Sequence, residues 1–232
     1  MSETLRFFSD ELQLMALGFM AVVYILRIRW LLKFKASRDR QAKSENMSAS
    51  SLKGIVYSWA NVAMPWSMES TRQMTFFYIQ FVVFHVAVAT NIGMSFIIPY
   101  APGLMKPVIV VRILQILFGA ACAIGCHRLY RRLSNPAIRL ISTPDDFFSL
   151  VLLTVWLFAS IFAAPNRPDL GEGSLMVYFI MTAFFLVYVP FSKISHYLYY
   201  PFTRFYFGRT MGHRGVYPIK RVPQTKNTAV KG

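Results

Sequence analysis

Two histidines lie in apolar surroundings that a membrane would bury. His85 lies in VVFHVAVATNIG and His196 lies in PFSKISHYLYY. An ionisable side chain inside a bilayer is costly, so each histidine is a candidate for function. Two neutral imidazoles that face each other across helices are the axial ligands that a low-spin b-type haem requires. The alternative for each histidine is a hydrogen bond inside a helix bundle, without a cofactor.

Other side chains near this pair suit the same chemistry. His127, in CAIGCHRLYRRL, could replace one haem ligand, bind a haem propionate or a quinone oxygen, or lie at the membrane interface. Lys193, one turn before His196, is the best candidate to neutralise a propionate. Arg204 could do the same near the membrane rim, or serve only as a basic anchor. His213, in RTMGHRGVYP, lies beyond the last apolar run and is expected to be a water-exposed tail residue.

Five apolar runs must position these residues. They cover about 12–32, 74–98, 108–129, 147–164 and 175–199. Crossing about 30 Å of hydrocarbon takes about 20 helical residues, and only helices satisfy their own backbone in lipid. The sequence therefore predicts an all-α bundle of five transmembrane helices, as one integral membrane domain over 1–232.

Two segments outside the runs have their own character. Residues 51–68 (SLKGIVYSWANVAMPWSM) are aromatic and too polar to span, which predicts an interfacial segment. Residues 208–232 are expected to form a cytoplasmic tail. The aromatic group from Tyr197 to Phe207 is typical of an interfacial belt and could also frame a quinone head group.

Composition excludes an ordinary soluble domain. Only 15% of residues are charged, 55% are hydrophobic, and the net charge is +15. The basic charge does not indicate nucleic-acid binding, because 21 of the 25 Lys and Arg residues fall on one side of the predicted spans. By the positive-inside rule the N-terminus is outside and the C-terminus is cytoplasmic, in a bacterial or archaeal inner membrane.

This topology brings the two histidines to similar depths. His85 is about 20 Å from the outer end of its run, and His196 is about 30 Å inward from the start of its run. The second and fifth helices are antiparallel, so both histidines are expected in the inner half of the membrane.

The runs VPFSKISHYLYYPFTRFYFGR and FHVAVATNIG resemble the cytochrome b subunit of respiratory nitrate reductase, its gamma subunit. They resemble even more closely the membrane subunits of heterodisulfide-reductase-type and dissimilatory sulfite-reduction complexes. The resemblance covers the second to fifth helices. It implies two haems, held by two histidines about ten residues apart on the second helix and two about eighteen apart on the fifth.

Only half of that ligand set matches here. The resemblance implies that His85 and His196 are the inner ligands. The outer positions fall at about Ser95 and at Val177 or Tyr178, which do not ligate haem b. We therefore expect one haem b, with menaquinone or ubiquinone as substrate and a cytoplasmic iron–sulfur subunit as partner. The rivals are a cofactor-free membrane anchor and a small transporter, although buried acids for ion transport are not evident.

Overall fold

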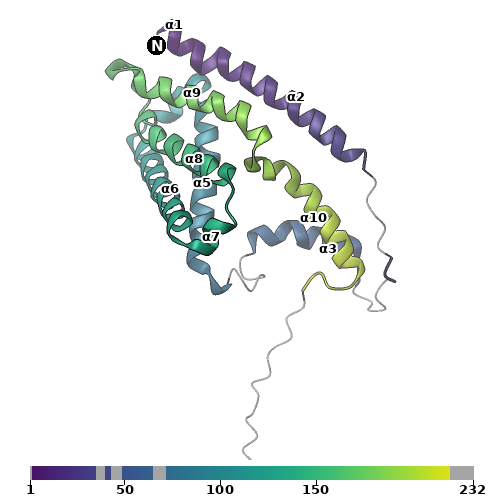
Figure 1. Ribbon diagram of the computed structural model, residues 1–232. Coiled ribbons are helices and arrows are strands. Elements are labelled where there is room, and N and C mark those ends of the chain that lie inside the picture. Colours follow the sequence, from purple (N-terminus) through teal and green to yellow (C-terminus); the bar gives the residue numbers. More distant parts are fainter. Residues whose placement is uncertain (1, 35–39, 43–48, 65–71, 220–232) are drawn as a thin grey trace, which may run out of the picture. The chain divides into compact units, whose positions relative to one another are not determined.

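The computed structural model describes residues 2–34, 40–42, 49–64 and 72–219, and all regular structure within them is helical. Five of the described helical segments are long and apolar enough to cross a bilayer. They are Glu3–Leu32, Thr75–Tyr100, Val108–Ser134, Pro144–Ala163 and Gly173–Phe191. The predicted all-α architecture with five candidate spans is confirmed, and it is that of a multi-pass membrane protein (Figure 1).

The first span is continuous through three helical segments: α1 (Glu3–Arg6), a π-helical turn (Phe7–Glu11) and α2 (Leu12–Leu32). The next three spans are α5 (Thr75–Tyr100), α6 (Val108–Ser134) and α8 (Pro144–Ala163). A short helix, α7 (Pro136–Leu140), joins α6 to α8, and Thr143 is the N-cap residue of α8.

The fifth run differs from its prediction as one helix over 175–199. Helix α9 (Gly173–Tyr188) ends early, and two 3₁₀ turns (Val189–Phe191 and Lys193–Ser195) precede α10 (His196–His213). Pro190 supplies no backbone N–H, and Ser192 is extended, with its Oγ accepting from Ile194 N at 3.2 Å. His196 is therefore the first residue of a new helix and does not lie inside a continuous one.

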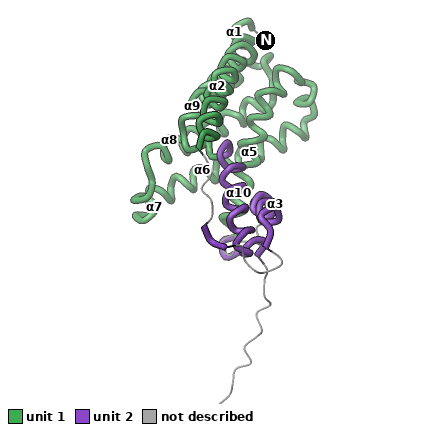
Figure 2. The backbone as a smooth tube through the Cα atoms, turned by 90° about the vertical axis from the view of Figure 1, so that its right-hand side faces the viewer, with its two compact units in different colours: residues 1–34, 75–196 green, residues 35–74, 197–232 purple. Residues whose placement is uncertain are grey.

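The chain divides into two compact units (Figure 2). The first comprises residues 1–34 and 75–196, and the second comprises 35–74 and 197–232. The predicted interfacial segment lies in the second unit. Its first part is α3 (Ser51–Ala60) with a 3₁₀ turn (Asn61–Ala63), while 65–68 lie outside the described residues. Of the predicted cytoplasmic tail, 220–232 also lie outside them.

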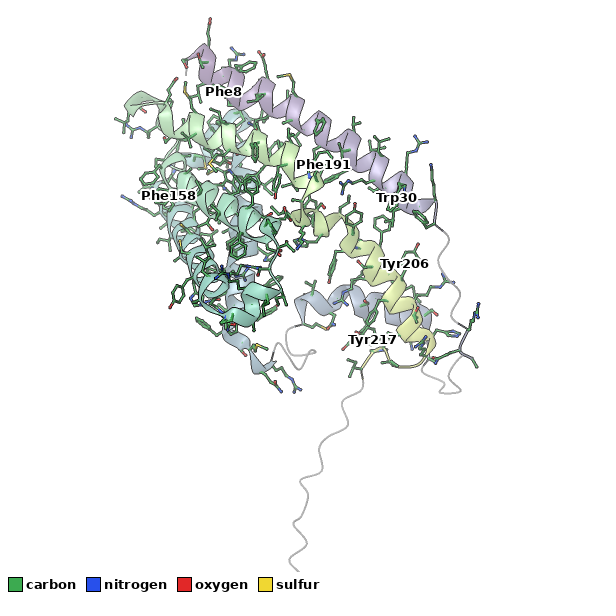
Figure 3. The ribbon with its side chains drawn as sticks, in the orientation of Figure 1. Phe8, Trp30, Phe158, Phe191, Tyr206 and Tyr217 are labelled. Atoms are coloured by element: carbon green, nitrogen blue, oxygen red, sulfur yellow. The ribbon has the colours of Figure 1, made fainter. Side chains whose placement is uncertain are left out.

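Within the first unit, α6 packs along α8, α2 packs along α9, and α8 packs along α9. The core between the helices is aromatic, with Phe118, Trp156, Tyr178 and Phe179 buried. The outward faces are also apolar: Phe158 on α8 is 53% exposed and points away from the bundle (Figure 3). An apolar surface around an apolar core fits a protein surrounded by lipid.

One glycine sets the approach of α6 to α8. A Cβ at Gly125 would lie 2.3 Å from Thr154 Oγ1 and 3.1 Å from its Cγ2, whereas one at Gly119 would meet nothing within 4 Å. Thr154 has little room to turn, because it is β-branched and its hydroxyl donates to Leu150 O at 2.7 Å.

We expect Gly125→Ala to destabilise the protein by about 1–3 kcal/mol through overpacking. Gly119→Ala, on the same helix, should be neutral or should stabilise by up to about 1 kcal/mol. Thermal unfolding of both variants in detergent checks the pair. Equal melting temperatures would contradict a close contact between α6 and α8 at Gly125.

Candidate functional site

The structure brings His85 and His196 together within the first unit. His85 lies on α5, and His196 opens α10 at the end of the unit. Their ring centroids are 6.3 Å apart, and the ring planes are inclined by 74°. The two imidazoles therefore meet, as their depths in the sequence predicted, although their role as ligands stays a prediction.

Both rings are held in the same way. Nδ1 of His85 lies 2.8 Å from Phe81 O, one turn earlier on α5. Nδ1 of His196 lies 3.1 Å from Lys193 O. A carbonyl oxygen only accepts, so in each neutral ring Nδ1 carries the proton and donates it. The lone pair then lies on Nε2, which is the tautomer of a metal-ligating imidazole with a carbonyl in its outer shell.

The separation of the rings fits a single ion between them. Since a metal–imidazole bond is about 2 Å long, imidazoles on opposite sides of one ion have ring centroids about 6 Å apart. In the described part of the chain no group of three or more His, Cys, Asp or Glu side chains could hold a bare metal ion. Two imidazoles alone suit an iron whose other four ligands come from a porphyrin.

Aromatic and basic side chains surround His85. The Phe81 ring lies 4.0 Å from the His85 ring, and the Phe84 ring lies 6.5 Å from it. Arg128 Cζ on α6 lies 5.2 Å from the centroid of the Phe84 ring. The Phe84 ring therefore contacts both the Arg128 guanidinium and the His85 ring. Arg128 can therefore present a cation to an acidic group bound beside His85.

Sequence reasoning singled out His127 and missed Arg128, its neighbour. His127 is exposed on α6, whereas Arg128 is only half-exposed. Among the described residues, no hydrogen bond or ring contact joins His127 to His85 or His196. Consecutive residues on a helix point about 100° apart. The packing of α6 against α5 therefore decides whether His127 or Arg128 is directed toward His85 and His196. The part of His127 in cofactor binding stays a prediction.

Lys193 lies near the pair but has a partner of its own. Its Nζ forms an ion pair with Asp146 Oδ2 at 3.0 Å and donates to Thr143 Oγ1 at 2.8 Å. The Asp146 carboxylate also accepts from the Thr143 backbone N–H at 2.8 Å, within the capping box of α8. Lys193 therefore fixes the segment before His196, and its predicted role with a propionate stays a prediction.

Asp145, at the start of α8, also binds the segment before His196. Its Oδ1 accepts from Tyr188 OH at 2.5 Å, and its Oδ2 accepts from Lys193 N at 3.3 Å. Asp145 and Asp146, the aspartate pair, thus bind both ends of the break between α9 and α10. The sequence pattern did not predict these contacts, because Tyr188 and Lys193 lie more than 40 residues away from the aspartate pair.

We expect Asp145→Asn to loosen this break and to displace His196. The loss in stability should be about 1 kcal/mol, because the bonds are partly solvated. If haem is bound, the electron paramagnetic resonance g-values of its oxidised form should shift, since they report the relative orientation of the two imidazoles. Asp169→Asn is the control: Arg167 holds the pKa of that exposed carboxyl below its usual range, outside the spans. Unchanged g-values in Asp145→Asn would contradict a positioning role.

Two further predicted residues belong to the second unit. Arg204 Cζ lies 5.5 Å from the Tyr200 ring centroid and 6.0 Å from that of Phe207. His213 Nε2 lies 3.1 Å from Gln41 O. The structure therefore gives His213 a backbone partner in its own unit. The part of Arg204 in cofactor binding stays a prediction.

Of the positions matched to the outer ligands, Ser95 and Tyr178 lie in a filled core, whereas Val177 is 50% exposed. Ser95 Oγ donates to Ile92 O at 2.7 Å, and Tyr178 OH donates to Asn91 O at 2.6 Å. The Tyr178 ring is stacked on that of Trp156 with centroids 6.3 Å apart. Tyr178 is fully buried. Bulky side chains therefore occupy this level of the bundle.

The fold and the pair together define an all-helical multi-pass membrane protein with a candidate bis-histidine site. No protein-family model matches the chain, and no solved structure matches it. A curated protein of Nitratidesulfovibrio vulgaris (strain Hildenborough), described only as "Protein", is 26% identical over 211 residues. The match covers 89% of this chain and 87% of that protein.

Proposed function

We propose that the protein is a haem b-containing membrane subunit of a respiratory complex. It would pass electrons between the quinone pool and a cytoplasmic iron–sulfur partner. The observation that carries this proposal is the pair His85 and His196, with ring centroids 6.3 Å apart and both Nδ1 atoms bonded to backbone carbonyls. The resemblance to nitrate reductase gamma subunits and related membrane subunits adds to it.

The residues present fit one haem. His85 and His196 would hold the iron, and Arg128 would lie beside the site, against the Phe84 ring. When bound, the haem supplies a one-electron carrier between two-electron quinone chemistry and one-electron clusters. The protein orients the two imidazoles through α5 and through the aspartate pair. The filled core around Tyr178 and Trp156 supports a single haem, because a second porphyrin would have to displace these rings.

The distribution of charge supports an orientation of the chain in the membrane and a side on which the partner binds. Of 25 Lys and Arg residues, 21 lie in the segments 27–72, 128–139 and 193–231. We propose that these segments are cytoplasmic and that the N-terminus is outside, in a bacterial or archaeal inner membrane. A basic face would then attract an acidic surface of the iron–sulfur subunit.

The quinone link is tested by reducing the protein in liposomes with a menaquinol or ubiquinol analogue. If the proposal is right, a quinol reduces the haem, and the reduction is followed in the visible spectrum. If dithionite reduces the haem but neither quinol does, the proposed exchange of electrons with quinone is contradicted. The proposal that the protein binds haem would still stand.

The second candidate function is a cofactor-free anchor for a redox partner. The observation that favours it is that both histidines already form hydrogen bonds with backbone carbonyls, as a structural histidine would. The two proposals differ in one respect that is easily measured, because the anchor binds no haem.

A further inference from the structure

Helix α3 exposes most of the apolar side chains that a water-soluble helix would bury. Two of its three buried positions are small, Gly54 and Ser58, which is 0% exposed, and the third is Ile55, which is 8% exposed. Asn61, directly after the helix, is polar and 2% exposed. The exposed positions of α3 include Leu52 at 70% and Val56 at 56%. A helix at the surface of a soluble domain shows the opposite arrangement, with its apolar face turned inward.

Glycines explain why the small face is buried. A Cβ at Gly54 would lie 2.2 Å from Gly208 O, and a Cβ at Gly212 would lie 2.4 Å from Ser50 O. The backbones of α3 and α10 are therefore in direct contact within the second unit, where the two helices lie side by side (Figures 1 and 2). Gly208 and Gly212 form a small-xxx-small motif, and Ser50, Gly54 and Ser58 form another. Close packing through such motifs is typical of helices in lipid.

The exposed side of α3 is a continuous apolar stripe. Leu52, Val56 and Trp59 follow one another at helical spacing on the face opposite Gly54. Trp59 Nε1 donates to Pro201 O at 3.0 Å, so its only donor is satisfied while 46% of the residue stays exposed. Exposed Lys53 flanks the stripe, and its long stem allows the ammonium group to reach water beside an apolar surface.

We propose that this stripe, Leu52, Val56 and Trp59, binds the surface of the bilayer, with its side chains among the acyl chains at head-group level. The continuity of the chain supports lipid as the occupant, since α10 begins five residues after the fifth span ends at Phe191. Charge supports it too. Residues 35–74 and 197–232 contain 13 Lys or Arg and 3 Asp or Glu, which suits anionic head groups. The proposal does not depend on haem.

Spin labelling of the full chain in liposomes with anionic lipid tests this proposal. A nitroxide is attached to Val56→Cys in a Cys122→Ala, Cys126→Ala background, and its collisions with oxygen and with a water-soluble nickel complex are compared. Oxygen concentrates in lipid, so oxygen collisions should dominate at position 56. Lys53→Cys, on the same helix, should show relatively more collisions with nickel. Dominant nickel collisions at position 56 would overturn the proposal.

A protein partner would give a different result. If a second copy or another subunit covered the stripe, neither reagent would reach position 56, and this outcome also overturns the proposal. Quenching of Trp fluorescence by brominated lipids gives a second measurement without a label. The component quenched in the intact chain should shrink in Trp59→Phe, and an unchanged quenched component would contradict lipid contact at this position.

Discussion

Replacing either His85 or His196 by Ala is expected to abolish haem binding. Both imidazoles would hold the iron in the proposed site, and a low-spin bis-histidine haem cannot form with only one of them. The purified variants should lose the b-type α band, and their haem content should fall from one per chain to none. The pyridine haemochrome assay measures that content directly.

The matched control is His127→Ala. His127 is exposed on α6, and we expect this variant to keep its haem and its spectrum. Retention of a bis-histidine haem in the His85 or His196 variant would contradict the pair. In that case His127 would be the next candidate ligand. Circular dichroism of each variant shows whether the helices are intact, so that a loss of haem is not mistaken for unfolding.

The second large effect is expected at Arg128. Its cation lies beside the ring of Phe84, the neighbour of His85, and would stabilise the reduced form of a bound haem, which carries one more electron than the oxidised form. A unit charge about 10 Å away contributes on the order of 1–2 kcal/mol at an effective dielectric constant near 20. For one electron, about 59 mV corresponds to a tenfold change in equilibrium. Arg128→Gln should therefore lower the midpoint potential of a bound haem by about 40–90 mV.

A redox titration of the α band measures this shift. Arg131→Gln is the control, because Arg131 lies on the same helix and its Cζ lies 4.3 Å from the ring centroid of Phe77, two turns before His85 on α5. Arg131→Gln removes the same charge, but this charge lies farther from His85 along α5. The shift in midpoint potential should therefore be smaller. Equal shifts in the two variants, or a rise in potential at Arg128→Gln, would contradict the placement of Arg128 beside the haem.

The helices and the meeting of the histidines were predictable, because both follow from short-range patterns. A run of about 20 apolar residues predicts a span by length alone, and antiparallel spans bring His85 and His196 to similar depths. The break before His196 was not predicted, although Pro190 and Ser192 signal it. In an apolar run a proline is a weak signal, since membrane helices tolerate prolines when neighbouring groups satisfy the backbone.

The remaining features depend on contacts between residues far apart in the sequence. The Asp145 carboxylate binds Tyr188, 43 residues later. Gly54 contacts Gly208 and Gly212 across more than 150 residues. The aromatic residues of 51–68, in a segment too polar to span, predicted an interfacial segment, but the sequence pattern did not indicate that α3 buries its small face. The apolar stripe of α3 is exposed because the glycine contacts with α10 bury the opposite face of the helix.

The visible spectrum of the purified wild-type protein tests the central claim most directly. The full chain is expressed in cells that supply haem, purified in mild detergent, and compared in its oxidised and dithionite-reduced forms. We predict the reduced α band of a low-spin b-type haem, with about one haem per chain by pyridine haemochrome. Protein that is folded and free of haem would contradict the bis-histidine site and favour a cofactor-free anchor.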